Sequence, residues 1–440
     1  MNSYNIGIRI LTFLLFLVLI FSVFGDLSLD ALIDSALATN PAIKSSAYEL
    51  QGSELRRYSA FTDLLPSLDL SGRYTYLGEI PYLAFPDDLS EIMPPGMGNI
   101  EMGRHDNFEI TAGLTQALFV GGAVYNANRL SANNVSMKQL SHEKAKSAVA
   151  LETKTAYFGL LRALSASNSA NAAYEGLSAH CDDLDRLFTE GMIEKADVLK
   201  AKVALAEIEL ALLSTANYIR IAKSELARLT GIDKEKLEID TSFVFTAFIV
   251  DPNEVEKMAV EKNFDIKMLS FAVRASELAI SMNKSKLLPG LALAANVHLK
   301  NPNPENQADW DRTWDLSLVS SWDVFSFGGN LADIKAARAD NNALRMQKKH
   351  LEDIIRQGIS AAMSALLESE LKIEVATKGL EQAHESLRAS KERFHAGATT
   401  NTDVLDAEAA LFRAMNNRTD AIVGYNITKA KILNLMGQVR

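Results

Sequence analysis

The chain of 440 residues contains one unit written twice. The stretch ALATNPAIK from Ala36 matches AVEKNFDIK from Ala259, at an offset of 223 residues. Near the end of each copy, LTG ending at Gly231 matches LMG ending at Gly437, at an offset of 206 residues. The offset is already 207 at the glycine pair after the returning strand, where Gly122 matches Gly329, so the first copy carries about sixteen extra residues (223 − 207) between its two strand-like segments. Such a repeat predicts one architecture built from two similar halves.

Four long segments are rich in strong helix formers, namely Ala, Leu, Glu, Lys and Arg. All ten prolines lie outside these segments, which span 123–190, 197–230, 330–396 and 403–436. A helix of nearly seventy residues would reach about 100 Å, so it must pack against neighbours along its whole length. Within the second segment, apolar residues recur at alternating steps of four and three, the spacing of a coiled-coil seam. They are Leu199, Val203, Ala206, Leu210 and Leu213.

Short segments between the helices alternate apolar and polar residues. Outgoing strands are predicted at SLDLSGRYTY from Ser67 and GLALAANVHLK from Gly290, and returning strands around Phe108 and Trp314. Each has about ten residues, the length of a tilted strand across a bilayer. The alternation is typical of a membrane barrel with a wet lumen, although a soluble sheet with one buried face would show it too. Proline-rich stretches at 81–98 and 301–307 are predicted to be external loops.

The number of strands limits how they can lie in a membrane. Two strands per repeat give four per chain, which is too few to close a barrel. An open edge cannot stand in lipid, because its backbone N–H and C=O groups would lack partners. Several chains must then share one barrel. Two chains would supply eight strands around a filled interior, whereas three would supply twelve, so a wet conduit favours three or more chains.

Composition and short motifs argue against several kinds of function. The net charge of −10 is scattered along the chain, which argues against nucleic acid as a partner. The lone cysteine, Cys181, allows no internal disulfide, and the histidines show no metal-binding spacing. HCDD from His180 is interpreted as a solvated helix face, and GGAVYNANR lacks the lysine of a phosphate loop. We therefore expect no enzymatic activity, no cofactor and no metal site.

The N-terminus looks like a targeting segment. Arg9 precedes the apolar run 10–24, whose length of about fifteen residues is short for a membrane span of about 20. Residues 1–25 are predicted to be a cleaved signal peptide, with an uncleaved anchor as the alternative. The mature chain is then exported, with a first repeat at 26–240 and a second at 251–440.

These features together resemble the outer-membrane efflux proteins of the TolC family, over essentially all of the mature chain. The resemblance rests on the duplicated NP.IK-like start, LLP before each outgoing strand, F.GG after each returning strand and a G.....DVL turn in each half. It implies a mainly α-helical homotrimer with a twelve-stranded β-barrel in outer-membrane lipid and an α-helical tunnel in the periplasm. Its implied function is the exit duct of a tripartite efflux or type I secretion system, with a periplasmic adaptor protein and an inner-membrane transporter as partners. A coiled-coil structural scaffold of the cell envelope is the alternative.

The resemblance also assigns roles to the turns. In the family the G.....DVL turns are periplasmic tips that close the tunnel at rest and receive the adaptor. The tip residues are Gly191, Met192, Gly397, Ala398 and Thr399. The two tip glycines are expected to adopt the left-handed backbone that ends a helix, and the next helices are expected to start at Ala196 and Thr402. Sharp turns from barrel to tunnel are expected at Gly121, Gly122, Gly328 and Gly329.

Two aspartates of the second repeat match those that form the family's acidic constriction. Three copies of Asp403 and Asp406 would place six carboxylates around a narrow axis. Carboxylates so close together favour bound cations or raised pKa values. The alternative for Asp403 is that it charges a helix N-terminus, where a carboxylate is favoured.

Asp197 of the first repeat matches a position that holds the family's tips together. Its partners in the family are a tyrosine and an arginine, but here those positions hold Phe394 and Thr399. Neither side chain supplies a phenol or a guanidinium. We therefore consider His395 and Lys195 as replacement partners, with charging of a helix N-terminus as the alternative role of Asp197.

Overall fold

The computed structural model describes residues 27–84, 99–101, 103–240, 245–303 and 309–439. The predicted signal peptide lies outside the described residues, as do residues 85–98 and 304–307 of the predicted external loops. The chain divides into two compact units. The first comprises residues 1–48, 140–267 and 350–440, and the second comprises residues 49–139 and 268–349.

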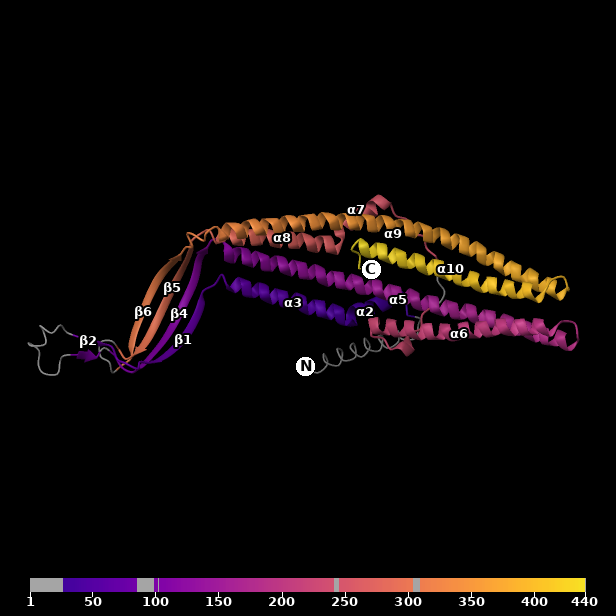
Figure 1. The fold of residues 1–440 in the computed structure, drawn as a ribbon, viewed down its shortest axis with the longest axis horizontal. Helices are drawn as coiled ribbons and strands as arrows, with labels where there is room; N and C mark the ends of the chain where they lie inside the picture. The colour runs from indigo at the N-terminus through magenta and orange to yellow at the C-terminus, as the bar shows by residue number, and fades with distance from the viewer. Residues whose placement is uncertain (1–26, 85–98, 102, 241–244, 304–308, 440) are drawn as a thin grey trace, which may run out of the picture. The chain divides into compact units, whose positions relative to one another are not determined.

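The order of helices and strands repeats along the chain (Figure 1). The first copy runs α2 (Leu29–Thr39), α3 (Pro41–Thr62), β1 (Ser67–Tyr76), β4 (Asp106–Val120), α5 (Ala123–Thr189) and α6 (Lys195–Thr230). The second runs α7 (Pro252–Lys262), α8 (Phe264–Ser285), β5 (Gly290–Asn301), β6 (Asp311–Ser321), α9 (Gly329–His395) and α10 (Asn401–Leu435). This order confirms the predicted fold class of two tandem repeats, four principal strands and long helices.

Three small elements were not predicted. The strands β2 (Tyr82–Ala84) and β3 (Asn99–Glu101) pair antiparallel; β2 lies inside the stretch 81–98 predicted to be the first external loop, and β3 directly follows that stretch. A short 3-10 helix, η1 (Lys234–Lys236), follows α6.

Each repeat closes on itself through the asparagine of its NP.IK-like start. Asn40 donates its Nδ2 hydrogen to the carbonyl of Leu229 at 3.3 Å, while its Oδ1 accepts from the backbone N–H two residues ahead at 2.9 Å. Asn263 makes the same two contacts, with the carbonyl of Leu435 at 3.3 Å and with the N–H two residues ahead at 2.9 Å. The motifs that begin and end each repeat therefore contact each other in the first unit.

The first unit buries its apolar side chains between helices. One cluster contains Leu32, Leu160, Leu161, Leu226 and Leu237, and another contains Ile355, Ile359, Ile422, Tyr425 and Ile432. The Tyr425 hydroxyl accepts a hydrogen bond of 2.6 Å from the N–H of Phe248, which ties the segment between the repeats to α10. In the described residues we find no helix with both the length and the apolar character needed to span a bilayer.

The predicted seam of α6 points away from the chain's own helices. Its leucines and valine are largely exposed: Leu199 52%, Val203 61%, Leu210 64% and Leu213 70%. The opposite side of the same helix is the buried one, with Val198 at 5%, Ala201 at 0% and Leu226 at 0%. A heptad seam needs a partner helix to cover it, so this row is available to another chain.

The second unit contains one antiparallel sheet of four strands in the order β1-β4-β5-β6 (Figure 1). Its register aligns an apolar row of Leu70, Ala112, Val297 and Trp314. The adjacent row, on the opposite face, is Ser71, Thr111, His298 and Thr313. Leu70 and Trp314 are 77% and 76% exposed, so the chain itself does not cover the apolar face. In the described residues β1 and β6 each pair on one side only, which leaves two open edges.

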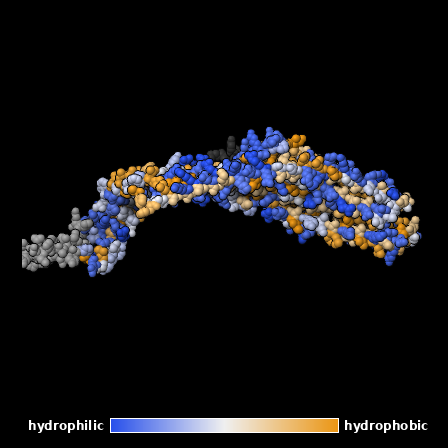
Figure 2. Space-filling view, turned by 45° about the horizontal axis from the view of Figure 1, so that its top comes forward, coloured by the Kyte–Doolittle hydropathy of each residue, from blue (hydrophilic) through white to orange (hydrophobic). Residues whose placement is uncertain are grey.

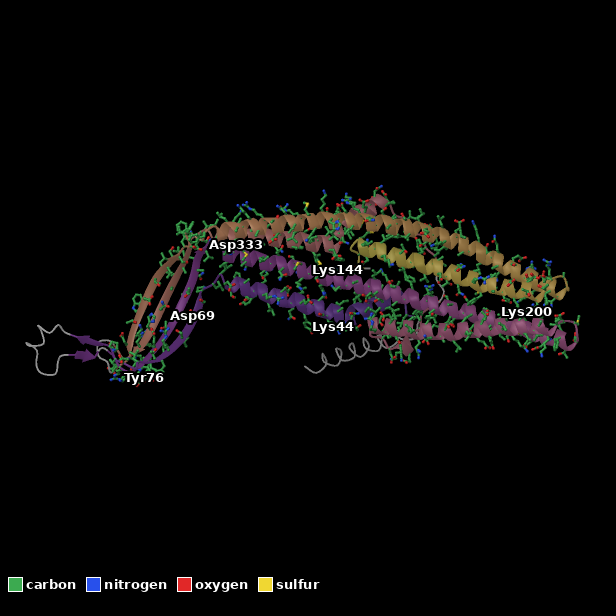
Figure 3. The ribbon with its side chains drawn as sticks, in the orientation of Figure 1. Lys44, Asp69, Tyr76, Lys144, Lys200 and Asp333 are labelled. Atoms are coloured by element: carbon green, nitrogen blue, oxygen red, sulfur yellow. The ribbon has the colours of Figure 1, made fainter. Side chains whose placement is uncertain are left out.

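Aromatic side chains collect at both ends of this sheet. At one end Tyr74, Tyr76 and Trp310 are 56%, 63% and 51% exposed. At the other end Trp322, Phe325 and Phe327 are 57%, 70% and 91% exposed. Figure 2 shows apolar side chains gathered where β6 leads into α9, and Figure 3 labels Tyr76 at the opposite end of the sheet. Aromatic belts at both ends are typical of strands that cross a membrane.

Candidate functional site

The two repeated turns of the first unit have the same backbone. Gly191 and Gly397 have φ angles of +75° and +69°, so both are left-handed as predicted. In each turn the residue after the glycine donates to the carbonyl five residues earlier, at 2.9 Å for Met192 and 2.8 Å for Ala398. This bond defines the Schellman motif, which ends a helix. The repeated glycine therefore encodes one helix-ending turn, used twice.

The repeated DVL places its valine in the core. Val198 and Val404 are 5% and 0% exposed on the first turns of α6 and α10. Around Val198 lie Cys181, Leu184 and Ala201, with Ile193, Phe394 and Leu405 packed against them. The two helices start one residue before the predicted Ala196 and Thr402, with Glu194 and Thr400 as their N-caps.

Asp403 caps the start of α10. Its Oδ2 accepts hydrogen bonds from the hydroxyl of Thr399 at 2.6 Å, and from the hydroxyl and N–H of Thr400 at 2.7 and 2.9 Å. These bonds lower the pKa of Asp403 to about 2 because they favour the ionised form. The bond from Thr399 has the largest effect. Bound cations or raised pKa values were expected for six carboxylates of three chains around one axis. Within one chain the pKa of Asp403 is lowered, and its side chain is part of the capping box of α10.

Asp197 occupies the equivalent position of the first repeat but has other contacts. Glu194 makes no capping bond with its side chain, and the Oδ1 of Asp197 lies 3.6 Å from the Nζ of Lys200 on the same helix. Within one chain the basic side chain nearest to this carboxylate is therefore Lys200, one turn further along α6, whereas His395 and Lys195 were considered as replacement partners of the lock. Figure 3 labels Lys200 in the part of α6 nearest the turn.

A buried polar contact joins the two helical hairpins, and sequence analysis did not predict it. Asn401 is 3% exposed and donates from Nδ2 to the carbonyl of Asp197 at 2.9 Å. Its Oδ1 lies 2.8 Å from Nε2 of His180. Because that amide oxygen can only accept, His180 is the donor. The imidazole also packs edge-on against the ring of Phe394, with centroids 5.3 Å apart.

The prediction that HCDD forms a solvated helix face was wrong for its first two residues. His180 and Cys181 are 6% and 4% exposed, whereas Asp182 is exposed. Residues of α6, α9 and α10 cover this side of α5, which the sequence of a single helix cannot reveal. Burial raises the pKa of the Cys181 thiol, which keeps it in the unreactive protonated form. In the part of the chain that the structure describes, no group of three or more His, Cys, Asp or Glu is placed to hold a metal ion.

The turns between sheet and helix differ between the repeats. The pair Gly121–Gly122 lies between β4 and α5, where a sharp turn was predicted, and both residues are left-handed, with φ of +61° and +81°. A Cβ on Gly121 would lie 2.6 Å from the carbonyl oxygen of Ser285, so only glycine fits there. In the second repeat the left-handed pair is Phe327 and Gly328, at +48° and +84°, while Gly329 begins α9. The second turn therefore lies one residue earlier than predicted.

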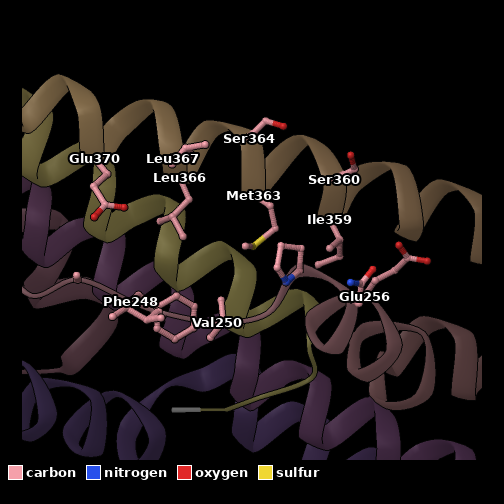
Figure 4. A pocket seen from close by; sticks show the side chains of 14 residues that line it. Phe248, Val250, Glu256, Ile359, Ser360, Met363, Ser364, Leu366, Leu367 and Glu370 are labelled. Carbon is pink, nitrogen blue, oxygen red and sulfur yellow. The ribbon is translucent and has the colours of Figure 1, made fainter.

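A cleft of about 520 Å³ lies in the first unit, between the segment joining the repeats and α9 (Figure 4). Its lining is mainly apolar and includes Phe248, Val250, Ile359, Met363 and Leu366. Glu256 pairs with Arg356 at 2.6 Å. The polar lining residues include Ser360, Ser364 and Glu370.

Long helices that end in paired turns, together with a sheet that exposes its apolar face, define a subunit of a membrane channel with a helical extension. The chain belongs to the outer membrane efflux protein family, whose model matches residues 32–232 and 256–438. It is accordingly an outer-membrane exit duct in efflux or secretion, and the scaffold alternative is set aside.

Relatives and solved structures agree with this family. The outer membrane protein TolC of Escherichia coli is 21% identical over 415 residues, which cover 91% of this chain and 80% of the relative. The alkaline protease secretion protein AprF of Pseudomonas aeruginosa is 25% identical over 344 residues, 74% of this chain and 69% of the relative. The crystal structure of VceC from Vibrio cholerae matches with a TM-score of 0.78 at 17% identity, over 93% of this chain and 96% of that chain. The crystal structure of the CmeC outer membrane channel of Campylobacter jejuni matches with a TM-score of 0.79 at 17% identity, over 93% of this chain and 85% of that chain.

Proposed function

We propose that three copies of the chain share one twelve-stranded barrel in the outer membrane and one helical tunnel in the periplasm. The observation that carries the proposal is the four-stranded sheet, which ends at β1 and β6 and exposes its apolar face. In lipid the backbone groups of both edges need partners. A second copy can supply them, and three copies give a barrel wide enough for a wet lumen.

Exposed apolar rows on the helices of the first unit support the same assembly. The seam of α6 is one row, and α9 carries another with Leu367 at 61%, Leu371 at 57% and Val375 at 71% exposed. Two different rows on one chain suit a head-to-tail ring, in which α6 of one copy meets α9 of the next. Covering both rows in the ring would remove large apolar side chains from water.

The paired turns form the periplasmic end of this tunnel in the proposed assembly. Asp403 and Asp406 of three copies surround the axis there as an acidic constriction. The residues Gly191, Met192, Gly397, Ala398 and Thr399 receive a periplasmic adaptor protein, which connects the duct to an inner-membrane transporter. The shared Schellman turn supports this role, since it presents both tips in one rigid conformation.

The assembly is tested by native mass analysis of the protein in detergent, which should give three chains. Leu210→Glu together with Leu213→Glu should convert the trimer to smaller species, because charges would be buried in the seam. Ala216→Glu adds a charge at an exposed position of α6 outside the seam and should leave the trimer intact. A stable monomer that conducts ions in planar bilayers would contradict the shared barrel.

A further inference from the structure

The polar face of the sheet in the second unit carries a connected group of ionisable side chains. Glu109 on β4 pairs in register with Lys300 on β5, and their side chains approach to 3.3 Å. His298 lies two residues before Lys300 on β5, so both side chains are on the same face. Asp315 lies on β6, diagonally across from His298. The carboxylates of Glu109 and Asp315 flank the imidazole of His298.

Both nitrogens of His298 have partners. Nε2 lies 2.9 Å from Oδ2 of Asp315, whose other oxygen accepts from Asn296 at 3.1 Å. Nδ1 lies 3.0 Å from the hydroxyl of Thr111 and 3.9 Å from Oε1 of Glu109. Because a carboxylate only accepts, Nε2 carries a proton and donates it to Asp315.

The hydroxyl of Thr111 lets this site accept either charge state of the imidazole. A hydroxyl can donate or accept. It donates to Nδ1 when His298 is neutral and accepts from Nδ1 when His298 is protonated. The side chain of His298 is 24% exposed, so water can deliver the proton. No rearrangement of the strands is needed for the charge to change.

The charges that face His298 come from every strand of the sheet. On β4 and β5 they are Glu109 and Lys300, and on β6 they are Asp311 and Asp315. The outer strand β1 adds Asp69 and Arg73 in the same rows (Figure 3 labels Asp69). These positions hold four carboxylates and two cations, so the face is acidic while His298 is neutral. One proton on His298 removes half of that net charge.

We propose that His298 sets the ion selectivity of the barrel wall as a function of pH. The inference rests on the proposed trimeric pore, in which this polar face lines the lumen. At neutral pH the acidic face favours cations. Histidine is the side chain that ordinarily changes charge between about pH 5 and 8, so mild acid makes the wall less cation-selective.

The test measures reversal potentials of the reconstituted trimer across a salt gradient at about pH 8 and about pH 5. In the unmodified protein the cation-to-anion permeability ratio should fall at the lower pH, because the net negative charge of the wall is halved. His298→Gln should keep the higher ratio at both pH values. His298→Lys should keep the lower ratio at both, which shows that the charge at this position, and not loss of the contact with Asp315, is responsible.

His105→Gln is the matched control. His105 precedes β4, forms a hydrogen bond with the carbonyl of Leu77 and stacks on Tyr76, so it lies beyond the paired rows of the sheet that hold His298. This variant should retain the pH response. A conducting trimer whose pH response survives in His298→Gln would overturn this inference alone. A trimer that fails to conduct would overturn the proposed function, and this inference with it.

Discussion

At the scale of single residues, equivalent positions of the two repeats have diverged in what they do. Asn401 and Lys195 both begin the helix after the turn, yet Asn401 is buried and Lys195 is exposed. Asn401 reaches the carbonyl of Asp197 and the ring of His180, so it links both hairpins of the chain. A single position of the second turn therefore adds a polar link between the two tips, beside the apolar contacts around Val198.

Asn401→Ala should destabilise the protein by about 1–3 kcal/mol, because it leaves the buried imidazole of His180 without its hydrogen-bond partner and removes the bond to the carbonyl of Asp197. The measurement is the free energy of unfolding in denaturant for the protein in detergent. Lys195→Ala changes the equivalent, exposed position and should have an effect within about 0.5 kcal/mol. Equal effects of the two substitutions would show that the buried link contributes nothing particular.

Asp403 makes the stability of the tip depend on pH. Its pKa in the folded protein is lowered to about 2 from an ordinary value of 3.8. The ionised cap therefore contributes stability above the ordinary value, and this contribution is lost as the pH falls toward 2. Asp403→Asn should be less stable than the unmodified protein at about pH 5, and the difference should shrink on acidification. Melting temperatures of both proteins at several pH values measure it, and a constant difference would argue against the cap.

At the scale of elements, the tip turn depends on a backbone conformation that side chains disfavour. Gly191 and Gly397 are left-handed, and nothing lies within 4 Å of the Cβ that either would gain. The glycine requirement there is thus a matter of backbone strain and not of space. The sheet-to-helix turn at Gly121 is the contrasting case, since a Cβ would meet the carbonyl of Ser285 at 2.6 Å.

Gly397→Ala should lower the free energy of unfolding by about 1–2 kcal/mol, the cost of a left-handed L-residue. Gly379, in the interior of α9, also has open space around it but has an ordinary helical backbone. Gly379→Ala should therefore raise the free energy of unfolding by about 0.5–1 kcal/mol. The same denaturant titration measures both, and effects of the same sign would refute the assignment to backbone strain.

At the scale of the whole molecule, the acidic constriction exists only if three chains assemble. In one chain Asp403 is engaged in its cap and Asp406 is exposed on α10. Three copies would bring six such carboxylates toward one axis, where they focus negative potential in a narrow mouth. The constriction is thus a property of the proposed trimer that no single chain contains.

Asp403→Ala together with Asp406→Ala should lower the cation selectivity of the trimer and weaken its block by trivalent cations. Reversal potentials and single-channel currents in planar bilayers measure the two effects. Asp182→Ala together with Asp183→Ala removes the same formal charge from α5 and should change neither. If the first double variant behaves like the second, the aspartates of α10 only start their helix and the constriction lies elsewhere.

The sequence by itself determined the repeat, the positions of the four long helices and the four principal strands, and the glycine turns. These features depend on local rules: proline ends helices, alternation marks strands, and glycine accepts a left-handed backbone. The strand predicted from Ser67 and the turn predicted at Gly397 were both found in place. The number of predicted strands, together with their alternation of apolar and polar residues, also indicated that one chain cannot close a barrel.

Only the tertiary structure decided which side of each helix is covered. It buried His180 and left Leu210 and Leu213 exposed, although all three lie in segments that were predicted to be helical, and it gave Asn401 its partners. It also made Phe327, and not Gly329, part of the second sheet-to-helix turn. Periodicity along one helix shows that a stripe exists but not which neighbour covers it, because that neighbour comes from a segment far away in the chain or from another copy.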